Sequence, residues 1–170
     1  MKATKYSKTF IYIFWILLFV VGYYGFGLYI ENQNNPNQNP EVSIGQEGQH
    51  IVYLNANQNH SYLVNGRINN YPVKFLVDTG ATSVVIPSSV ARKIGLRKGY
   101  PYRAKTANGI ITVYSTKIDK ISIGNIFLSN IDASINTSEK SDIILLGMSA
   151  LKHLEIHYKN KMMILIQNKS

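Results

Sequence analysis

An acidic turn interrupts two apolar runs in residues 74–87, which read KFLVDTGATSVVIP. Asp78, Thr79 and Gly80 stand where two buried strands are predicted to meet, and an unpaired charge in such a place is costly. An aspartate after a strand also forms ordinary turns that have no function. The chemical alternative is acid–base catalysis by a pair of carboxylates. Two carboxylates about 3 Å apart share one proton, because like charges that close cannot both ionise, so that one can accept a proton while the other donates one.

A second segment, IILLGMSALKHLEI at residues 143–156, repeats the scheme of an apolar strand that ends in glycine. Together the two segments resemble the retropepsin-like aspartic proteases, most closely their membrane-anchored bacterial branch. The resemblance covers roughly residues 55–167 and implies a fold, an activity and a set of site residues. It implies that Asp78 is catalytic, that Thr79 braces the catalytic pair, and that Gly80 helps to hold the substrate backbone and the loop. It also implies supporting positions near the site at Ala81 and Gly147.

The catalytic pair needs a second carboxylate, and this chain has no second Asp-Thr-Gly. Its other aspartates, Asp119, Asp132 and Asp142, do not stand in a similar turn. We therefore predict that the partner is Asp78 of another copy, so that a homodimer with two-fold symmetry is the smallest active unit. Retroviral members follow the second glycine with an arginine, whereas Met148 follows here, so their dimer contacts are not carried over.

A β-hairpin flap closes over the substrate in this family, and residues 105–115, KTANGIITVYS, occupy the expected place. The tip would be Asn108 and Gly109, and these two residues with Ile110 are the predicted substrate contacts. The alternative is an ordinary surface hairpin.

The N-terminal third of the chain differs in composition from the rest. Residues 9–30 contain no charged residue over 22 positions, enough for a helix to cross a hydrocarbon core of about 30 Å. A cleaved secretory signal is the rival interpretation, but no small-residue cleavage site follows. Lysines precede the span, which predicts a cytoplasmic segment at 1–8, a transmembrane anchor at 9–30 and a periplasmic remainder, on the inner membrane. Residues 31–50 are polar and are predicted to be a flexible linker.

Residues 51–170 are predicted to form the protease domain. They consist of short β-like runs separated by turn signals such as Asn69-Asn70 and Gly124-Asn125, with Asn65-Gly66 as a competing turn. Residues 88–95 and 148–154 read as short helices. We therefore predict an all-β fold, a single-lobe, retropepsin-like β-barrel with one or two short helices.

Composition excludes some functions and leaves others open. The chain has no cysteine and a formal net charge of +9, but its basic residues are scattered, which favours a solvated surface over a nucleic-acid site. His153 and His157 have a spacing that suits a metal on a helix, yet the glutamate of a zinc protease is missing, and we predict no metal and no cofactor. The partners predicted are a second copy, a peptide or protein substrate and the membrane. Two classes of function remain: an aspartic endopeptidase, and a binding or dimerisation module of the same fold without turnover.

Overall fold

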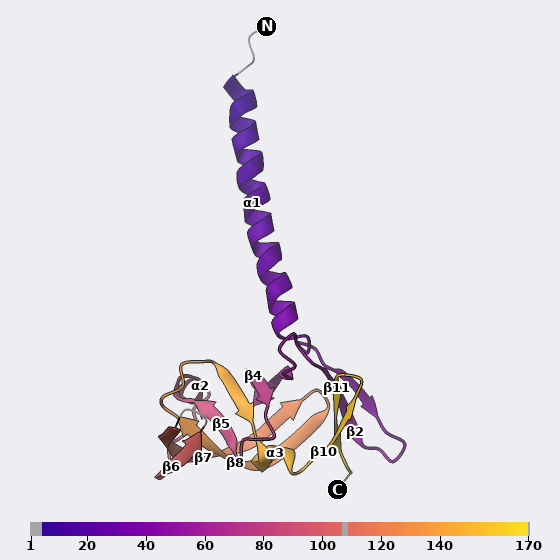
Figure 1. Ribbon diagram of the computed structural model, residues 1–170, viewed down its shortest axis with the longest axis vertical. Coiled ribbons are helices and arrows are strands. Elements are labelled where there is room, and N and C mark those ends of the chain that lie inside the picture. Colours follow the sequence, from indigo (N-terminus) through magenta and orange to yellow (C-terminus); the bar gives the residue numbers. More distant parts are fainter. Residues whose placement is uncertain (1–4, 107–108, 170) are drawn as a thin grey trace. The chain divides into compact units, whose positions relative to one another are not determined.

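The computed structural model describes residues 5–106 and 109–169. The chain divides into two compact units, Met1–Asn34 and Asn35–Ser170, which are described separately (Figure 1). The elements in chain order are α1 (Lys5–Asn34), β1 (Glu41–Ile44), β2 (His50–Asn55), β3 (Leu63–Ile68), β4 (Tyr71–Val77), β5 (Val84–Pro87), α2 (Ser88–Lys93), β6 (Pro101–Thr106), β7 (Gly109–Ile123), β8 (Ile126–Asn136), β9 (Ile143–Leu146), α3 (Met148–Leu151), β10 (Glu155–Lys159) and β11 (Met162–Gln167).

The first unit is the helix α1. Its segment Lys8–Asn34 reaches a mean hydropathy of 2.0, and apolar side chains are exposed all around it. A helix needs about 20 apolar residues to cross a bilayer, so α1 is long and apolar enough to do so. An N-terminal signal sequence has the same features. Anchoring by residues 9–30 therefore stays a prediction.

The second unit is built of strands. Seven of them form a sheet in the order β3-β4-β9-β5-β8-β7-β6, and an additional pairing of β3 with β7 closes this sheet on itself. The pairs β4–β9 and β5–β8 are parallel. The other four strands form a sheet in the order β1-β2-β11-β10. The predicted all-β barrel with two short helices is thus confirmed.

The core is a cluster to which strands of both sheets contribute, and it follows the two-residue period of the strands. In β4, Phe75 and Val77 are buried while Lys74 is exposed. The short helices add buried side chains to the same core, with Val90 from α2 and Leu151 from α3. This packing fixes the ends of β4 and β9, where the acidic turn lies.

Several predicted turns have the backbone that tight hairpins require. Asn69 and Asn70 have φ of 48° and 69° and join β3 to β4, and Gly124 has φ of 55° between β7 and β8. The competing pair Asn65-Gly66 lies inside β3 instead. Gly66 is required there because a Cβ would come within 2.5 Å of the carbonyl oxygen of Ser122.

Part of the segment predicted to be a flexible linker, residues 31–50, has regular structure. Residues up to Asn34 belong to α1, and Glu41–Ile44 form β1, which pairs with β2. Asn35 and Asn37 are 2% and 1% exposed. The Asn37 amide donates to the carbonyl oxygens of Asn55 (2.9 Å) and Leu63 (2.6 Å), and its Oδ1 accepts from the Asn55 N–H at 2.7 Å. Polar residues are ordered here by hydrogen bonds rather than by apolar burial.

Candidate active site

The Asp78 turn lies where the parallel strands β4 and β9 end together, with Val77 beside Leu146. The Asp78 N–H donates to the Leu146 carbonyl oxygen at 3.1 Å, which fixes the backbone at the end of β4. The Gly80 N–H donates to Oδ1 of Asp78 at 2.9 Å, and the Ala81 N–H donates to the Asp78 carbonyl oxygen at 3.3 Å. The carboxylate is therefore held in one orientation by its own turn.

The edge of this turn faces outward. The Asp78 side chain is half-buried, whereas Thr79 and Gly80 are exposed. The Thr79 hydroxyl has no hydrogen-bond partner among the residues that the structure describes. The turn thus presents one carboxylate and one free hydroxyl at the surface.

Gly147 lies directly behind the loop that follows Asp78. A Cβ on Gly147 would come within 2.2 Å of the Ser83 carbonyl oxygen and 2.7 Å of the Ala81 carbonyl oxygen, distances that real Cβ atoms do not reach. The Met148 N–H then donates to the Ala81 carbonyl oxygen at 2.8 Å. The absence of a side chain at position 147 therefore lets α3 bind the Asp78 loop directly.

Serine hydroxyls complete this support, and sequence reasoning did not single them out. Ser149 donates its N–H to the Thr82 carbonyl oxygen at 3.0 Å, and its Oγ accepts from the Val84 N–H at 2.9 Å. The hydroxyls of Ser83 and Ser134 lie 3.1 Å apart. The weak signal that could have revealed Ser149 is its place two residues after Gly147.

The other aspartates have neighbours of their own. Asp119 accepts from the Asn69 amide at 3.5 Å, and Asp142 lies 3.7 Å from Lys93 at the start of β9, the end opposite to Asp78. Asp132 stands across from Lys117 in the β7–β8 pair. Within residues 5–106 and 109–169, no second carboxylate shares a hydrogen bond with Asp78.

The segment predicted as the flap is the outer part of a hairpin of β6 and β7. Strand pairing runs from Pro101 opposite Tyr114 to Thr106 opposite Gly109. Gly109 and Ile110 are both exposed, and Ile110 is 60% exposed. Asn108 lies outside the described residues.

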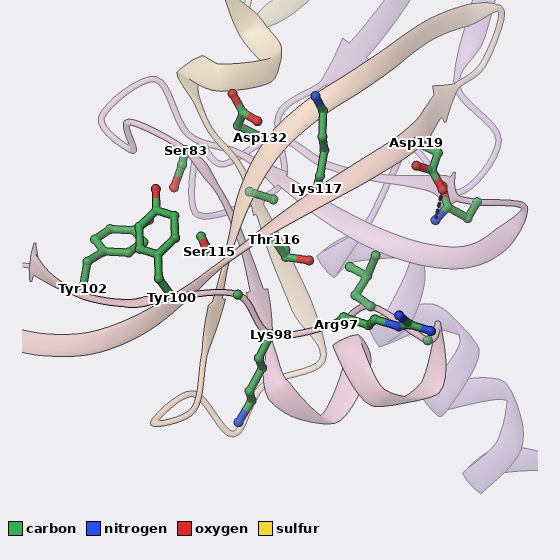
Figure 2. A pocket seen from close by; sticks show the side chains of 15 residues that line it. Ser83, Arg97, Lys98, Tyr100, Tyr102, Ser115, Thr116, Lys117, Asp119 and Asp132 are labelled. Carbon is green, nitrogen blue, oxygen red and sulfur yellow. Dashed lines mark hydrogen bonds between the residues drawn. The ribbon is translucent and has the colours of Figure 1, made fainter.

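A cavity of about 970 Å³ lies between the base of this hairpin and the loop after Asp78 (Figure 2). Tyr100 and Tyr102 stand side by side on its wall, with ring centroids 6.0 Å apart, and Ser83 faces the cavity near them. Asp78 itself does not line it. The lining residues are Asn69, Ser83, Gly95, Leu96, Arg97, Lys98, Gly99, Tyr100, Tyr102, Ser115, Thr116, Lys117, Asp119, Asp132 and Ala133.

The two histidines that suggested a metal site do not lie together on a helix. His157 lies in β10, where its Nε2 is 3.6 Å from Glu155, and His153 precedes that strand. The described part of the chain brings no three His, Cys, Asp or Glu side chains into a cluster that could hold a metal ion.

Residues 64–153 match the model of the family described as "gag-polyprotein putative aspartyl protease". The chain is 33% identical over 118 residues to an uncharacterized protein encoded 5′ of cobV in a Sinorhizobium species, and 30% identical over 119 residues to an uncharacterized protein of Rickettsia prowazekii. These alignments cover 68% of this chain and 51% and 50% of the two relatives, so the chain spans about half the length of the curated relatives it matches.

Among solved structures, the fold is similar to that of a retropepsin-like aspartic protease from Rickettsia conorii. The TM-score is 0.59 at 25% identity, and the match covers 75% of this chain and 95% of the other. The fold and the family are those of the retropepsin-like aspartic proteases. The chain belongs to the gag-polyprotein aspartyl protease family.

Proposed function

We propose that this chain is an aspartic endopeptidase that acts as a homodimer, with Asp78 of each copy forming the catalytic pair. One observation carries this proposal. Asp78 lies on a hydrogen-bonded turn at the end of β4, and no second carboxylate from the described part of the same chain hydrogen-bonds to it. Membership of an aspartyl protease family supports the same chemistry.

The proposed reaction uses one proton shared between the two Asp78 side chains. The ionised carboxylate takes a proton from water as the water oxygen attacks the scissile carbonyl carbon, while the protonated carboxyl group donates its proton to the carbonyl oxygen. The amide nitrogen then takes this proton from the pair, a hydroxyl of the tetrahedral intermediate returns its proton to the pair, and the C–N bond breaks, so that the pair again shares one proton. The Gly80 N–H steadies each carboxylate throughout, because it already donates to Oδ1 in the single chain.

Thr79 supports the pairing of two turns. Its exposed hydroxyl lacks a partner in the described chain, and an exposed turn is open to a second copy. We assign Thr79 to bracing the two Asp78 loops against each other across the two-fold axis. Gly80 and Ala81 would hold the loop and the substrate backbone beside it.

The substrate would be an extended peptide between the Asp78 turn and the β6–β7 hairpin. The cavity beside Ser83 offers room for its side chains, and the two tyrosine rings offer apolar contact. Gly109 and Ile110 project from the outer part of the hairpin, where a flap would cover the peptide. Asn108 would complete its tip.

We further propose that α1 anchors the enzyme in a bacterial inner membrane, with its N-terminus in the cytoplasm and the protease unit in the periplasm. The apolar length of α1 and the lysines before it support this orientation.

The decisive experiment measures peptide hydrolysis by the full-length protein in detergent, with and without pepstatin. Asp78→Asn should lower the rate about 100-fold or more, because a general acid–base group contributes that much. Asp142→Asn is the matched control, since its carboxylate lies in an exposed ion pair with Lys93, and it should keep its activity. Peptide binding without any hydrolysis by the wild type would instead identify a binding module.

A further inference from the structure

One segment of the second unit is basic and contains no acidic residue. Residues 92–105, RKIGLRKGYPYRAK, run from α2 through the following loop into β6. Their basic side chains are all exposed and are those of Arg92, Lys93, Arg97, Lys98, Arg103 and Lys105. Among the described residues, only Lys93 of these six lies in an ion pair, 3.7 Å from Asp142. The positive charge of the other five is therefore not neutralised by ion pairs within the described chain.

The β6–β7 hairpin presents part of this charge on one face. Side chains alternate along a strand, and residues opposite each other in an antiparallel pair lie on the same face of the sheet. Arg103 is opposite Thr112, and Lys105 is opposite Ile110. These four side chains therefore share one face of the hairpin, which we call the outer face. All four are exposed, and Ile110 is 60% exposed.

Lys98 adds a third cation to the outer face. Tyr114 lies two positions after Thr112 and opposite Pro101, so its ring projects from the outer face. The Nζ atom of Lys98 lies over this ring, 4.6 Å from its centroid. The contact is a cation–π interaction, which leaves the charge of the ammonium group in place. Lys98, Arg103 and Lys105 thus make the outer face positive.

The opposite face of the hairpin has a different environment. Tyr102 is opposite Val113, and both project from that face. Tyr102 lines the cavity near Ser83 (Figure 2), and Val113 is 2% exposed. A partner on the outer face would therefore leave the cavity side of the hairpin in place.

The composition of the outer face is typical of a surface that binds anionic phospholipid. Ammonium and guanidinium groups are attracted to the phosphates of the headgroups, and an apolar side chain such as that of Ile110 can enter the interface beside them. The centres of protein–protein interfaces are instead depleted of lysine. A lipid surface therefore fits this face better than another protein does.

The connection between α1 and the second unit is short enough to keep that unit near a membrane. The uncharged span ends at Ile30, α1 continues to Asn34, and Asn35 is already 2% exposed within the second unit. The four helical residues after Ile30 extend about 6 Å, at 1.5 Å per residue. This is less than the Debye length of about 8 Å at physiological ionic strength. The second unit therefore begins within the electrostatic field of anionic headgroups.

We propose that the outer face of the β6–β7 hairpin binds the anionic phospholipid surface of the membrane in which α1 is anchored. Lys98, Arg103 and Lys105 would contact headgroup phosphates, and Ile110 would enter the interface. This inference rests on the proposed function, because α1 supplies the membrane. It adds a second membrane contact, made by the hairpin that is expected to cover the substrate.

A fluorescent label on the outer face tests the contact in full-length protein reconstituted into vesicles. The chain contains no cysteine, so Thr112→Cys provides a single labelled position, and Thr112 is exposed. Vesicles of phosphatidylcholine alone are compared with vesicles that also contain phosphatidylglycerol, and both carry the same amount of a lipid with a nitroxide on its headgroup. The nitroxide quenches a fluorophore that lies against the headgroups. Both leaflets have the same composition, so either orientation of α1 gives the same result.

Quenching should be strong in the anionic vesicles and weak in the neutral ones. It should disappear from the anionic vesicles in about 1 M salt, because the Debye length then falls to about 3 Å. Equal quenching in the two kinds of vesicle, or quenching that salt does not change, would overturn the proposal.

Charge removal tests which cations are responsible. Arg103→Gln combined with Lys105→Gln should lower the ratio of contacting to free hairpins about 10- to 30-fold, as read from the quenched and unquenched lifetimes. Arg103→Lys combined with Lys105→Arg keeps both charges and should quench as the parent protein does, which controls for folding. Lys159→Gln combined with Lys161→Gln removes two exposed lysines from the end of the β10–β11 hairpin. This matched control should keep the ratio within about 2-fold, and equal effects of the two glutamine variants would reject the outer face.

Alkaline extraction of the vesicles and a peptide assay separate this inference from the proposed function. Protein that resists extraction, with a label that anionic lipid does not quench, would keep the anchor and reject the hairpin contact. Protein that alkali removes, with a label that is quenched as expected, would keep the lipid-binding face and reject the anchor. If Arg103→Gln with Lys105→Gln weakens hydrolysis of acidic peptides in detergent and anionic lipid quenches no label, the cations serve substrate recognition and the lipid contact is rejected.

Discussion

Replacing Gly147 by alanine should both destabilise the folded unit and displace the Asp78 turn. The backbone at Gly147 has φ of −93° and ψ of −173°, which any residue can adopt, so the cost is steric alone. The added methyl group would meet the carbonyl oxygens of Ser83 at 2.2 Å and Ala81 at 2.7 Å. Both atoms belong to backbone that is tied to α3, so neither can turn aside as a flexible side chain would.

The magnitude follows from overpacking of a tight contact, which costs about 1–3 kcal/mol. Since 1 kcal/mol lowers the Tm of domains in this size range by roughly 2–8 °C, we expect Gly147→Ala to lower the Tm by about 5–10 °C. The hydrolysis rate should fall at least about tenfold, because a displacement of a fraction of an ångström in a catalytic group is costly.

Thermal unfolding of the full-length protein, followed by circular dichroism, measures the first effect, and peptide hydrolysis measures the second. Gly25→Ala is the matched control, because a Cβ at Gly25 in α1 has no atom within 4 Å. It should leave the unfolding of the strands and the activity unchanged. A Gly147→Ala protein with the Tm and the activity of the wild type would refute the close approach of Gly147 to the Asp78 loop.

Two further predictions concern the Asn37 contacts and the pH of catalysis. Asn37→Ala removes three hydrogen bonds from a side chain that is 1% exposed. It leaves partly buried backbone groups of Asn55 and Leu63 without these partners, so it should lower the unfolding free energy by about 1–3 kcal/mol. Denaturant unfolding would detect this, with the exposed Asn59→Ala as control, and an unchanged midpoint would contradict it. Hydrolysis should be fastest in acid, because a carboxylate pair works with one shared proton, and a pH–rate profile with its maximum above about pH 8 would rule out that mechanism.

Local sequence signals predicted much of the fold. Asn69, Asn70 and Gly124 adopt positive φ in hairpin turns, as their residue types indicate. The helix predicted over residues 88–95 forms as α2, and Gly95 follows it with φ of 75°. These features depend on a few neighbouring residues, so a single sequence suffices to find them.

The pairing of strands that lie far apart in the sequence was harder to predict. The parallel pair of β4 with β9 joins residues about 70 positions apart, and no local pattern specifies it. The Asp78 turn could be predicted because the sequence Asp-Thr-Gly is specific to it. The contacts of Ser149 could not be predicted, because the residue type does not distinguish a serine that binds a loop from a serine that faces water. Only the fold shows that Oγ of Ser149 accepts from the Val84 N–H.

The polar segment before β2 shows most clearly where composition misleads. A shortage of apolar residues predicts disorder because little surface can be buried, yet an asparagine side chain can replace a missing strand partner with two donors and one acceptor. Asn37 does so between β2 and β3, and Asn35 donates to the Asn65 side chain at 2.9 Å. A cut in the turn between β1 and β2 would leave Asn37 bonded and β1 paired, and the folded unit still attached. A cut that removes α1 and keeps all of these contacts must therefore lie on the N-terminal side of Asn35, within residues that belong to the helix.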